Sequence, residues 1–231
     1  MRLQILSGGA AQSVVTALGG DFRLETGYQL DCTFSAVGAM KAQLLAGAPA
    51  DLVILTQTLI AELAAGGQVL ADSCAVLGRV RTGVAVRSAE RLPDIASAAA
   101  LRSALLAAEG IYFPDPQKAT AGIHFAGVLD SLGIRAELAP RLRTYPNGAT
   151  AMSELAGAQG ARLIGCTQVT EINNTHGVVL AGMLPREYEL STVYSVGVCA
   201  AAPNPDAARR FAALLTSEAS RALRIRAGFE F

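Results

Sequence analysis

Four short turns rich in small residues carry the clearest chemical signal in this sequence. They span residues 7–10, 35–38, 120–122 and 147–148, and each lies between an expected strand and an expected helix. The start of a helix presents unpaired backbone N–H groups and the positive end of the helix dipole, which together can bind an anion. The same residue types are also ordinary helix caps. Four such turns in one chain nevertheless favour a binding site for a small anion, and the expected contacts are Ser7, Gly8, Gly9, Ala10, Ser35, Ala36, Val37, Thr120, Ala121, Asn147 and Gly148.

Three ionisable side chains lie on or beside these turns and could transfer a proton if the protein is an enzyme. They are Lys118, His124 and Tyr145. Lys118 is also expected to contact an anionic ligand, because its turn should face the ligand, although it could equally be a solvated loop charge. His124 is more readily explained as a histidine that packs or faces water, and Tyr145 as a packing residue. Cys166 is expected to be a small buried hydrophobe.

Several kinds of function lack support in the sequence. The four cysteines form no C-x-x-C pair and there are only two histidines, so no metal site is expected. There is no G-x-S-x-G, H-E-x-x-H or P-loop motif, and no cofactor is expected. Lys plus Arg equals Asp plus Glu at 19 each and aromatic residues make up 5% of the chain, which disfavours nucleic acid as a partner.

Short apolar runs alternate with stretches of helical period along the whole chain. Residues 3–6 read as a strand, and Val14, Val15 and Phe22 then fall on one face of a helix. Such alternation is typical of an α/β protein with mainly parallel sheets flanked by helices. We expect two lobes, residues 1–82 plus 178–231 and an inserted lobe of residues 83–177, with a ligand cleft between them and a hinge at the crossings.

Several motifs in this order resemble the molybdate-binding, ModA-like type II periplasmic binding proteins. They are Ala-Gly-Ala-Pro-Ala-Asp at 46–51, Thr-Ala-Gly-Ile at 120–123, Gly-Cys-Thr-Gln at 165–168 followed by Glu171 and Ile172, and Ala-Gly-Phe-Glu at 227–230. The resemblance covers nearly the whole chain and implies the two-lobed type II fold. Thr167 and Gln168, in the third motif, join the expected ligand contacts.

The sequence departs from that family in the residues expected at the ligand. The serines that contact the oxyanion in molybdate binders correspond to positions on or near Ala10 and at 36–38, where this chain has Ala36, Val37 and Gly38. A tyrosine of those binders corresponds approximately to Gly165, which predicts room for a larger ligand. The sequence therefore does not predict molybdate in particular as the ligand.

Two functions follow from these observations. The first is a solute-binding protein of the kind that serves ABC transporters, which holds a small oxyanion or carboxylate and passes it to a transporter permease if the protein is exported. The alternative, which the resemblance also implies, is a cytosolic isomerase of a small unsaturated carboxylic acid, because some relatives of the ModA-like group are isomerases of unsaturated tricarboxylates, as aconitate isomerase is. The chain as written starts without a signal peptide, so we expect a cytoplasmic protein, or a periplasmic one if a signal was removed. No segment reaches the length of a membrane-spanning helix.

Overall fold

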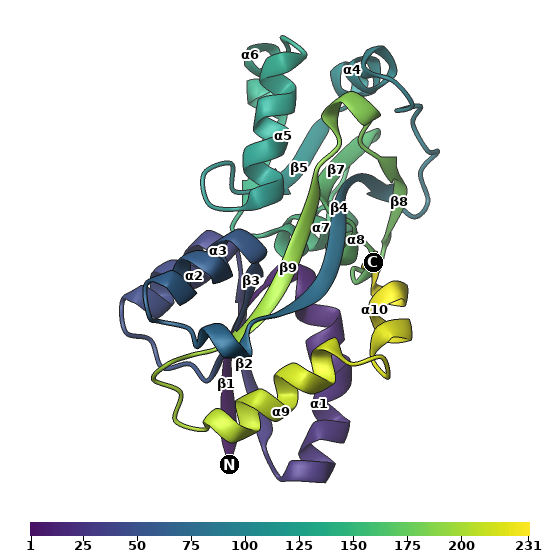
Figure 1. Cartoon of the computed structure of the whole chain (residues 1–231). Helices are drawn as coiled ribbons and strands as arrows, with labels where there is room; N and C mark the ends of the chain where they lie inside the picture. Colours follow the sequence, from purple (N-terminus) through teal and green to yellow (C-terminus); the bar gives the residue numbers. More distant parts are fainter. The chain divides into compact units, whose positions relative to one another are not determined.

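The computed structural model describes all 231 residues, and the chain divides into two compact units. Unit 1 consists of Met1–Val80 and Thr192–Phe231, and unit 2 of Arg81–Ser191. Each unit has a sheet with helices packed on it, which confirms the predicted α/β class (Figure 1). The structure puts the residues from 178 to 191 in unit 2, whereas the sequence analysis assigned them to the first lobe. No helix is long and apolar enough to cross a membrane.

Unit 1 has a sheet in the order β2-β1-β3-β9. Strand β1 is parallel to both β2 and β3, whereas β9 runs antiparallel to β3. The strands are β1 (Arg2–Gly8), β2 (Gln29–Ser35), β3 (Leu52–Thr56) and β9 (Ser191–Val198). The helices are η1 (Gly9–Ala11), α1 (Gln12–Thr26), α2 (Val37–Leu45), α3 (Gln57–Ala65), η2 (Ala71–Ser73), α9 (Pro205–Thr216) and α10 (Arg221–Ala227).

The core of unit 1 follows the apolar pattern of the sequence. Val14, Val15 and Phe22 of α1 are buried, as their spacing predicts. The ring of Phe22 meets that of Phe211 edge to face, with 4.9 Å between centroids. Every residue of β3 except Thr56 is buried, as expected for a central strand covered on both faces. Burial of these faces is the main stabilising contribution to the unit.

Asp51, the last residue of the Ala-Gly-Ala-Pro-Ala-Asp motif, has a structural role. Its fully buried carboxylate accepts hydrogen bonds from the backbone N–H of Gln4 at 2.8 Å and of Asn204 at 2.6 Å. It therefore ties β1 to the segment that leads into α9. The most specific motif of the resemblance thus holds unit 1 together at the amino end of β3.

Unit 2 has a sheet in the order β4-β7-β5-β6, and β8 also pairs with β4. Strands β5, β6 and β7 are parallel, whereas β4 is antiparallel to both β7 and β8. The strands are β4 (Ala75–Arg87), which begins in unit 1, β5 (Gly110–Pro114), β6 (Leu142–Tyr145), β7 (Leu163–Gln168) and β8 (Val178–Met183). The helices are α4 (Ala98–Ala107), α5 (Thr120–Ser131), α6 (Arg135–Leu138), η3 (Ala139–Arg141), α7 (Gly148–Gly157), α8 (Val169–Asn173) and η4 (Arg186–Tyr188).

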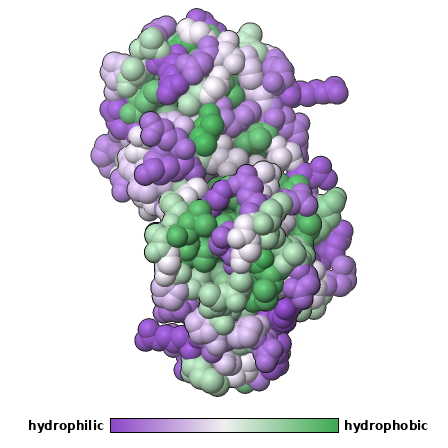
Figure 2. Space-filling model, turned by 60° about the vertical axis from the view of Figure 1, so that its left-hand side comes forward, coloured by the Kyte–Doolittle hydropathy of each residue, from purple (hydrophilic) through white to green (hydrophobic).

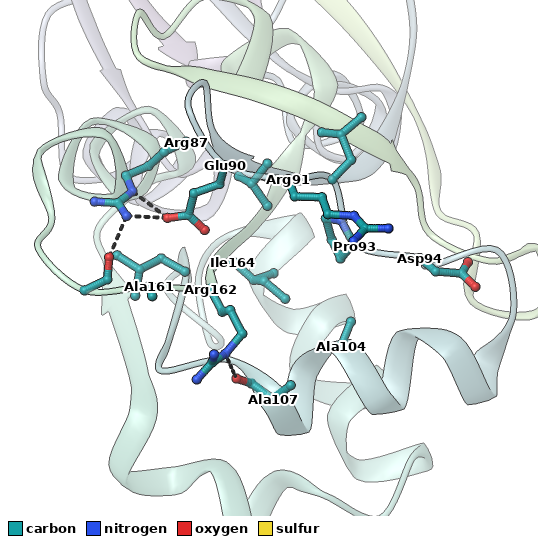
Figure 3. Close-up of a pocket in the computed structure, with 14 residues that line it drawn as sticks. Arg87, Glu90, Arg91, Pro93, Asp94, Ala104, Ala107, Ala161, Arg162 and Ile164 are labelled. Atoms are coloured by element: carbon teal, nitrogen blue, oxygen red, sulfur yellow. Dashed lines mark hydrogen bonds and ion pairs between the residues drawn. The ribbon is translucent and has the colours of Figure 1, made fainter.

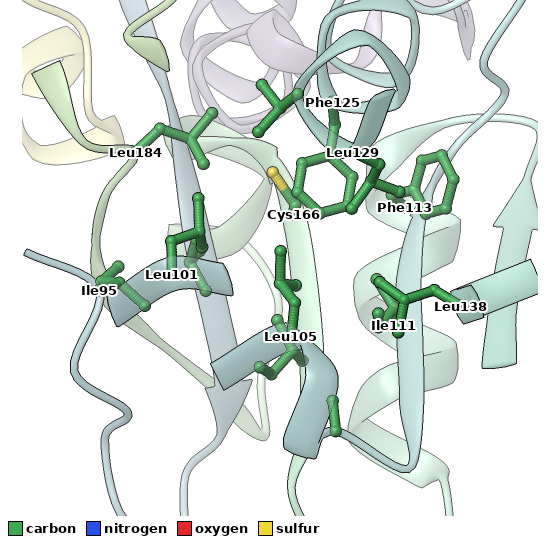
Figure 4. Close-up of a cluster of buried hydrophobic side chains, with 14 of the residues drawn as sticks. Ile95, Leu101, Leu105, Ile111, Phe113, Phe125, Leu129, Leu138, Cys166 and Leu184 are labelled. Atoms are coloured by element: carbon green, nitrogen blue, oxygen red, sulfur yellow. The ribbon is translucent and has the colours of Figure 1, made fainter. Parts of the chain in front are cut away.

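A buried apolar cluster under α4 and α5 forms the main core of unit 2 (Figure 4). Phe113 of β5 and Phe125 of α5 pack edge to face at 5.2 Å between ring centroids. Cys166 of β7 lies among these side chains and is fully buried, and burial raises the pKa of its thiol well above the ordinary value. The residue is therefore part of the core and is not placed to act as a nucleophile.

Candidate functional site

In unit 1 the structure brings two of the four predicted turns together. The parallel pairing of β1 with β2 places Gly8 opposite Ser35, so both turns follow strand ends at the same edge of the sheet. A Cβ atom on Gly8 would lie 2.7 Å from a methyl carbon of Val37, so α2 packs directly on the end of β1. Ser7 is fully buried and its hydroxyl donates to the carbonyl of Gly8 at 2.9 Å.

In unit 2 the carboxyl ends of the parallel strands gather the other predicted residues. Pro114 at the end of β5 pairs with Tyr145 at the end of β6, and β7 ends beside them at Gln168. Helices α5 and α7 both begin just beyond this edge, with Thr120 and Gly148 as their first residues. This edge is where open parallel sheets bind ligands.

Side-chain caps separate the helix starts into two groups. Thr56, Ser97 and Asn147 cap α3, α4 and α7, because each side-chain oxygen accepts a backbone N–H of the first turn. Alanine occupies the cap position of α1, α2 and α5, as Ala11, Ala36 and Ala119, and no side chain caps these helices. The short helices α6, α8 and α10 also lack a side-chain cap, as does α9, which begins with proline and so has one N–H fewer to satisfy. The first-turn N–H groups of α2 and α5 therefore have no side-chain acceptor in the protein.

The start of α7 is already bound to a carboxylate of the protein itself. Glu171 of α8 is buried and accepts hydrogen bonds from the Thr167 hydroxyl at 2.5 Å and from the backbone N–H groups of Gly148, Ala149 and Gln168. A Cβ atom on Gly148 would lie 2.0 Å from both the Glu171 carboxylate and the Thr167 hydroxyl. The prediction that Gly148 and Thr167 face a ligand is therefore not supported, because Glu171 occupies their donors.

Glu171 was missed as a functional residue in the sequence, although it follows the Gly-Cys-Thr-Gln motif closely. Burial raises the pKa of its carboxyl above the ordinary value of 4.5, and the hydrogen bonds from Thr167 and the backbone oppose that rise. Asn147 adds a second cap to the same helix, since its side-chain oxygen accepts from the N–H of Thr150 at 2.8 Å and from its hydroxyl at 3.0 Å. Nothing in the sequence indicates which helix start Glu171 contacts.

The three candidate proton-transfer residues have different surroundings. The ring nitrogen Nε2 of His124 lies 2.7 Å from the carbonyl oxygen of Tyr188, so this histidine bridges two segments of unit 2. Tyr145 stacks on Tyr112 with 6.1 Å between ring centroids, and burial raises the pKa of its hydroxyl. Lys118 is exposed on the loop before α5, and the structure records no partner for its amine. Of the three candidates, Lys118 is therefore the one whose side chain has no partner within the protein.

Gly165 does not leave space for a ligand, contrary to the expectation from the resemblance. A Cβ atom there would lie 2.5 Å from Met152 and 2.7 Å from Leu155, both of α7. Core side chains therefore fill the volume above this glycine. No group of three or more His, Cys, Asp or Glu residues is arranged to hold a metal ion.

Open parallel sheets bind ligands beyond the carboxyl ends of their strands, and helix starts at that edge can hold an anion. The chain belongs to the bacterial extracellular solute-binding protein family, whose sequence model matches residues 3–230. This confirms the predicted resemblance to periplasmic binding proteins.

Three proteins similar to this chain are named for three different compounds. The periplasmic molybdate-binding protein of Azotobacter vinelandii has a TM-score of 0.79 to this chain at 20% identity, covering 99% of both chains. The sulfate-binding protein SubI of Mycobacterium tuberculosis has a TM-score of 0.77 at 16% identity, covering 99% of this chain and 86% of that one. Aconitate isomerase of a Pseudomonas species is 26% identical over 228 residues, 94% of this chain and 82% of that protein.

Proposed function

We propose that this protein binds a small anionic solute, an oxyanion or a small carboxylate, at an uncapped helix start, and that α2 of unit 1 and α5 of unit 2 offer the candidate starts. The observation that carries the proposal is the presence of alanine at the cap positions, Ala36 and Ala119, where α3, α4 and α7 have a capping side chain. Such a helix start offers N–H donors and a positive dipole end to an anion. Membership in a solute-binding family supports the same function.

Neighbouring features of each unit fit an anion as well. In unit 1, Gly9 and Ala10 present small residues beside the start of α2, so that a ligand can approach the backbone closely. In unit 2, the amine of Lys118 precedes the start of α5 and adds a positive charge to it. The molybdate- and sulfate-binding relatives are named for inorganic oxyanions, and the isomerase is named for a tricarboxylate. All three of these compounds are anions.

A new carboxylate at each cap position tests the two helix starts separately. Ala36→Asp and Ala119→Asp would place a negative charge where the ligand charge should lie, and two unit charges about 4 Å apart repel by about 4 kcal/mol at an effective dielectric constant of 20. That energy corresponds to a loss of affinity of roughly a thousandfold. Ala42→Asp and Ser97→Asp are the controls. The first adds the same charge at an exposed position within α2 beyond its first turn, and the second adds it at a cap position that already has a capping side chain.

The ligand is sought with a thermal-shift panel of molybdate, tungstate, sulfate, phosphate, citrate and both aconitate isomers, followed by calorimetric titration. A ligand at 100 times its dissociation constant should stabilise the protein by about 2.7 kcal/mol. We expect this stabilisation to disappear in at least one of the two alanine-to-aspartate variants, which identifies the helix start that binds the ligand, and to persist in both controls. Equal binding by all four variants, each correctly folded, would place the site elsewhere.

The similarity to aconitate isomerase over 94% of the chain favours a second candidate, proton transfer on a small unsaturated carboxylic acid. Such a reaction removes a proton next to the double bond and returns one at its other end, so it needs a base at the ligand. Lys118 is our candidate for that base because its amine has no partner within the chain. His124 and Tyr145 remain the alternatives.

Deuterium exchange distinguishes the enzyme from the receptor. The protein is incubated with cis- and trans-aconitate in deuterated water, and the olefinic and methylene protons are followed by NMR. Exchange that vanishes in Lys118→Met supports an isomerase with Lys118 as its base, whereas exchange that survives moves the base to His124 or Tyr145. If neither acid exchanges protons while one anion stabilises the protein in a saturable way, the isomerase hypothesis fails for these acids and the binding-protein hypothesis stands. As a receptor outside the cytoplasm, the protein would deliver its ligand to a transporter permease.

A further inference from the structure

Unit 2 contains a cavity at the edge of its sheet opposite to the start of α5. Its volume is about 670 Å³, and residues from the end of β4, the beginning of β7 and the last turns of α4 line it (Figure 3). Because β4 runs antiparallel to β7, the end of β4 and the beginning of β7 meet at this edge. Helices α5 and α7 begin at the other ends of the parallel strands. The cavity is therefore separate from the candidate anion site.

The floor of the cavity is apolar and its rim carries arginines. Val86, Ala104 and Ile164 contribute apolar surface. Arg87 pairs with Glu90 and also donates to the carbonyls of Ala158 at 2.5 Å and Gly160 at 2.6 Å. These bonds satisfy the charge of Arg87 within the protein.

Two further arginines complete the rim, and only one of them has its charge satisfied. Arg162 pairs with Glu109 at 3.0 Å and donates to the carbonyl of Ala107 at 2.9 Å. It is also the only residue other than glycine in the left-handed backbone region, with φ of 51°, so these bonds hold it in a rarely populated conformation. Arg91 is exposed and lines the cavity, and its guanidinium has no hydrogen-bond or ion-pair partner within the protein.

We propose that this cavity binds an amphipathic anion, a molecule with an alkyl or aryl part and a single carboxylate or similar group. Small-molecule sites are typically concavities of roughly 300–1,000 Å³ with apolar walls and a few polar groups that fix orientation. The apolar part would lie against Ala104 and Ile164, and the anionic group would contact Arg91. Of the lining carboxylates, Glu90 is paired with Arg87, and Asp94 accepts a hydrogen bond from the backbone N–H of Ala96 at 3.0 Å.

Octanoate is a suitable probe. Butyrate keeps the carboxylate but has a shorter alkyl chain, and octanol keeps the chain but has no charge. We expect octanoate to bind more tightly than either compound in calorimetry and in saturation-transfer NMR. Arg91→Gln should weaken octanoate binding about tenfold, the ratio expected for one lost charge-assisted hydrogen bond. Arg210→Gln, which removes an exposed arginine of unit 1, should leave the affinity unchanged.

A second pair of variants tests the cavity without changing charge. Ala107→Trp fills the cavity from the exposed end of α4 and should abolish octanoate binding, whereas Ala99→Trp on an exposed position of the same helix should not. Neither variant should change the response to the small inorganic oxyanions, which keeps this proposal distinct from the anion site on α2 and α5. Octanoate binding that survives Ala107→Trp unchanged would overturn the proposal, as would the absence of any octanoate binding to the wild-type protein.

Discussion

The starts of α5 and α7 look alike in the sequence but differ in the folded unit. Both follow parallel strands at the same sheet edge, and both begin with small residues. Helix α7 has an asparagine cap and a buried carboxylate, Glu171, bound to its first N–H groups. Helix α5 has Ala119 at its cap position and no side-chain acceptor. A helix start can therefore be called an anion site only after the partners of its N–H groups are known.

Glu171 supplies at α7 the hydrogen-bond acceptors that a bound ligand would supply at α5. Its carboxylate gathers a hydroxyl and three N–H donors in a buried place, so that each donor is satisfied. Figure 2 shows hydrophilic and hydrophobic side chains interspersed over the face that it displays. The distinction between the two helix starts is one of hydrogen-bond partners.

The largest effect is expected when the internal carboxylate is removed. Glu171→Ala should lower the free energy of unfolding by about 3 kcal/mol or more, because each buried donor left without an acceptor costs roughly 1–3 kcal/mol. Urea unfolding followed by circular dichroism measures the loss. Glu154→Ala, at an exposed position of α7, is the matched control and should change stability little. Equal losses in the two variants would refute the role given to Glu171.

A methyl group at the start of α7 should also destabilise the protein. Gly148→Ala places a carbon 2.0 Å from the Glu171 carboxylate and the Thr167 hydroxyl, so both must move. The expected loss is about 1–3 kcal/mol, as for overpacked sites. At Gly157, the last residue of the same helix, no atom lies within 4 Å of the added carbon, and Gly157→Ala should be neutral or slightly stabilising.

The pH dependence of stability should report Glu171 directly. Because burial raises the folded-state pKa of Glu171 above 4.5, the folded protein keeps this proton to a higher pH than the unfolded chain. The stability that Glu171 contributes is therefore complete below pH 4.5 and falls as pH rises through the folded-state pKa, by at most about 1.4 kcal/mol per pH unit. Urea unfolding at a series of pH values should show this fall in the wild type and its absence in Glu171→Gln. Parallel curves for both proteins would contradict the assignment.

The smallest effect is expected from adding a cap to α5. Ala119→Ser supplies the hydroxyl acceptor that this helix lacks and should raise the free energy of unfolding by about 0.5–1 kcal/mol. Ala99→Ser, at an exposed position inside α4, is the control and should give no gain. Thermal unfolding measures the gain, which would show that α5 lacks the acceptor that α7 has. A loss of stability in Ala119→Ser would show instead that the first-turn donors of α5 are already satisfied.

Much of the fold could be predicted because it depends on local patterns. The buried face of α1, with Val14 and Phe22, follows from its helical spacing. The helices that begin at Val37, Thr120 and Gly148 follow from the small-residue turns predicted there. Strand β6 was not predicted, since Leu142–Tyr145 is short and partly exposed and has no clear apolar alternation. The space above Gly165 was misjudged because a resemblance between sequences says nothing of the neighbours Met152 and Leu155.

The sequence by itself determined the α/β class, the family and the set of helix starts that could bind an anion. Only the tertiary structure decided which of these starts remain open. The physical reason is that a backbone N–H group can be satisfied by an acceptor far along the chain, as Glu171 satisfies Gly148, and such pairing leaves no local pattern. The cavity rimmed by Arg91 and Arg162 likewise exists only because the chain brings the end of β4 to the beginning of β7.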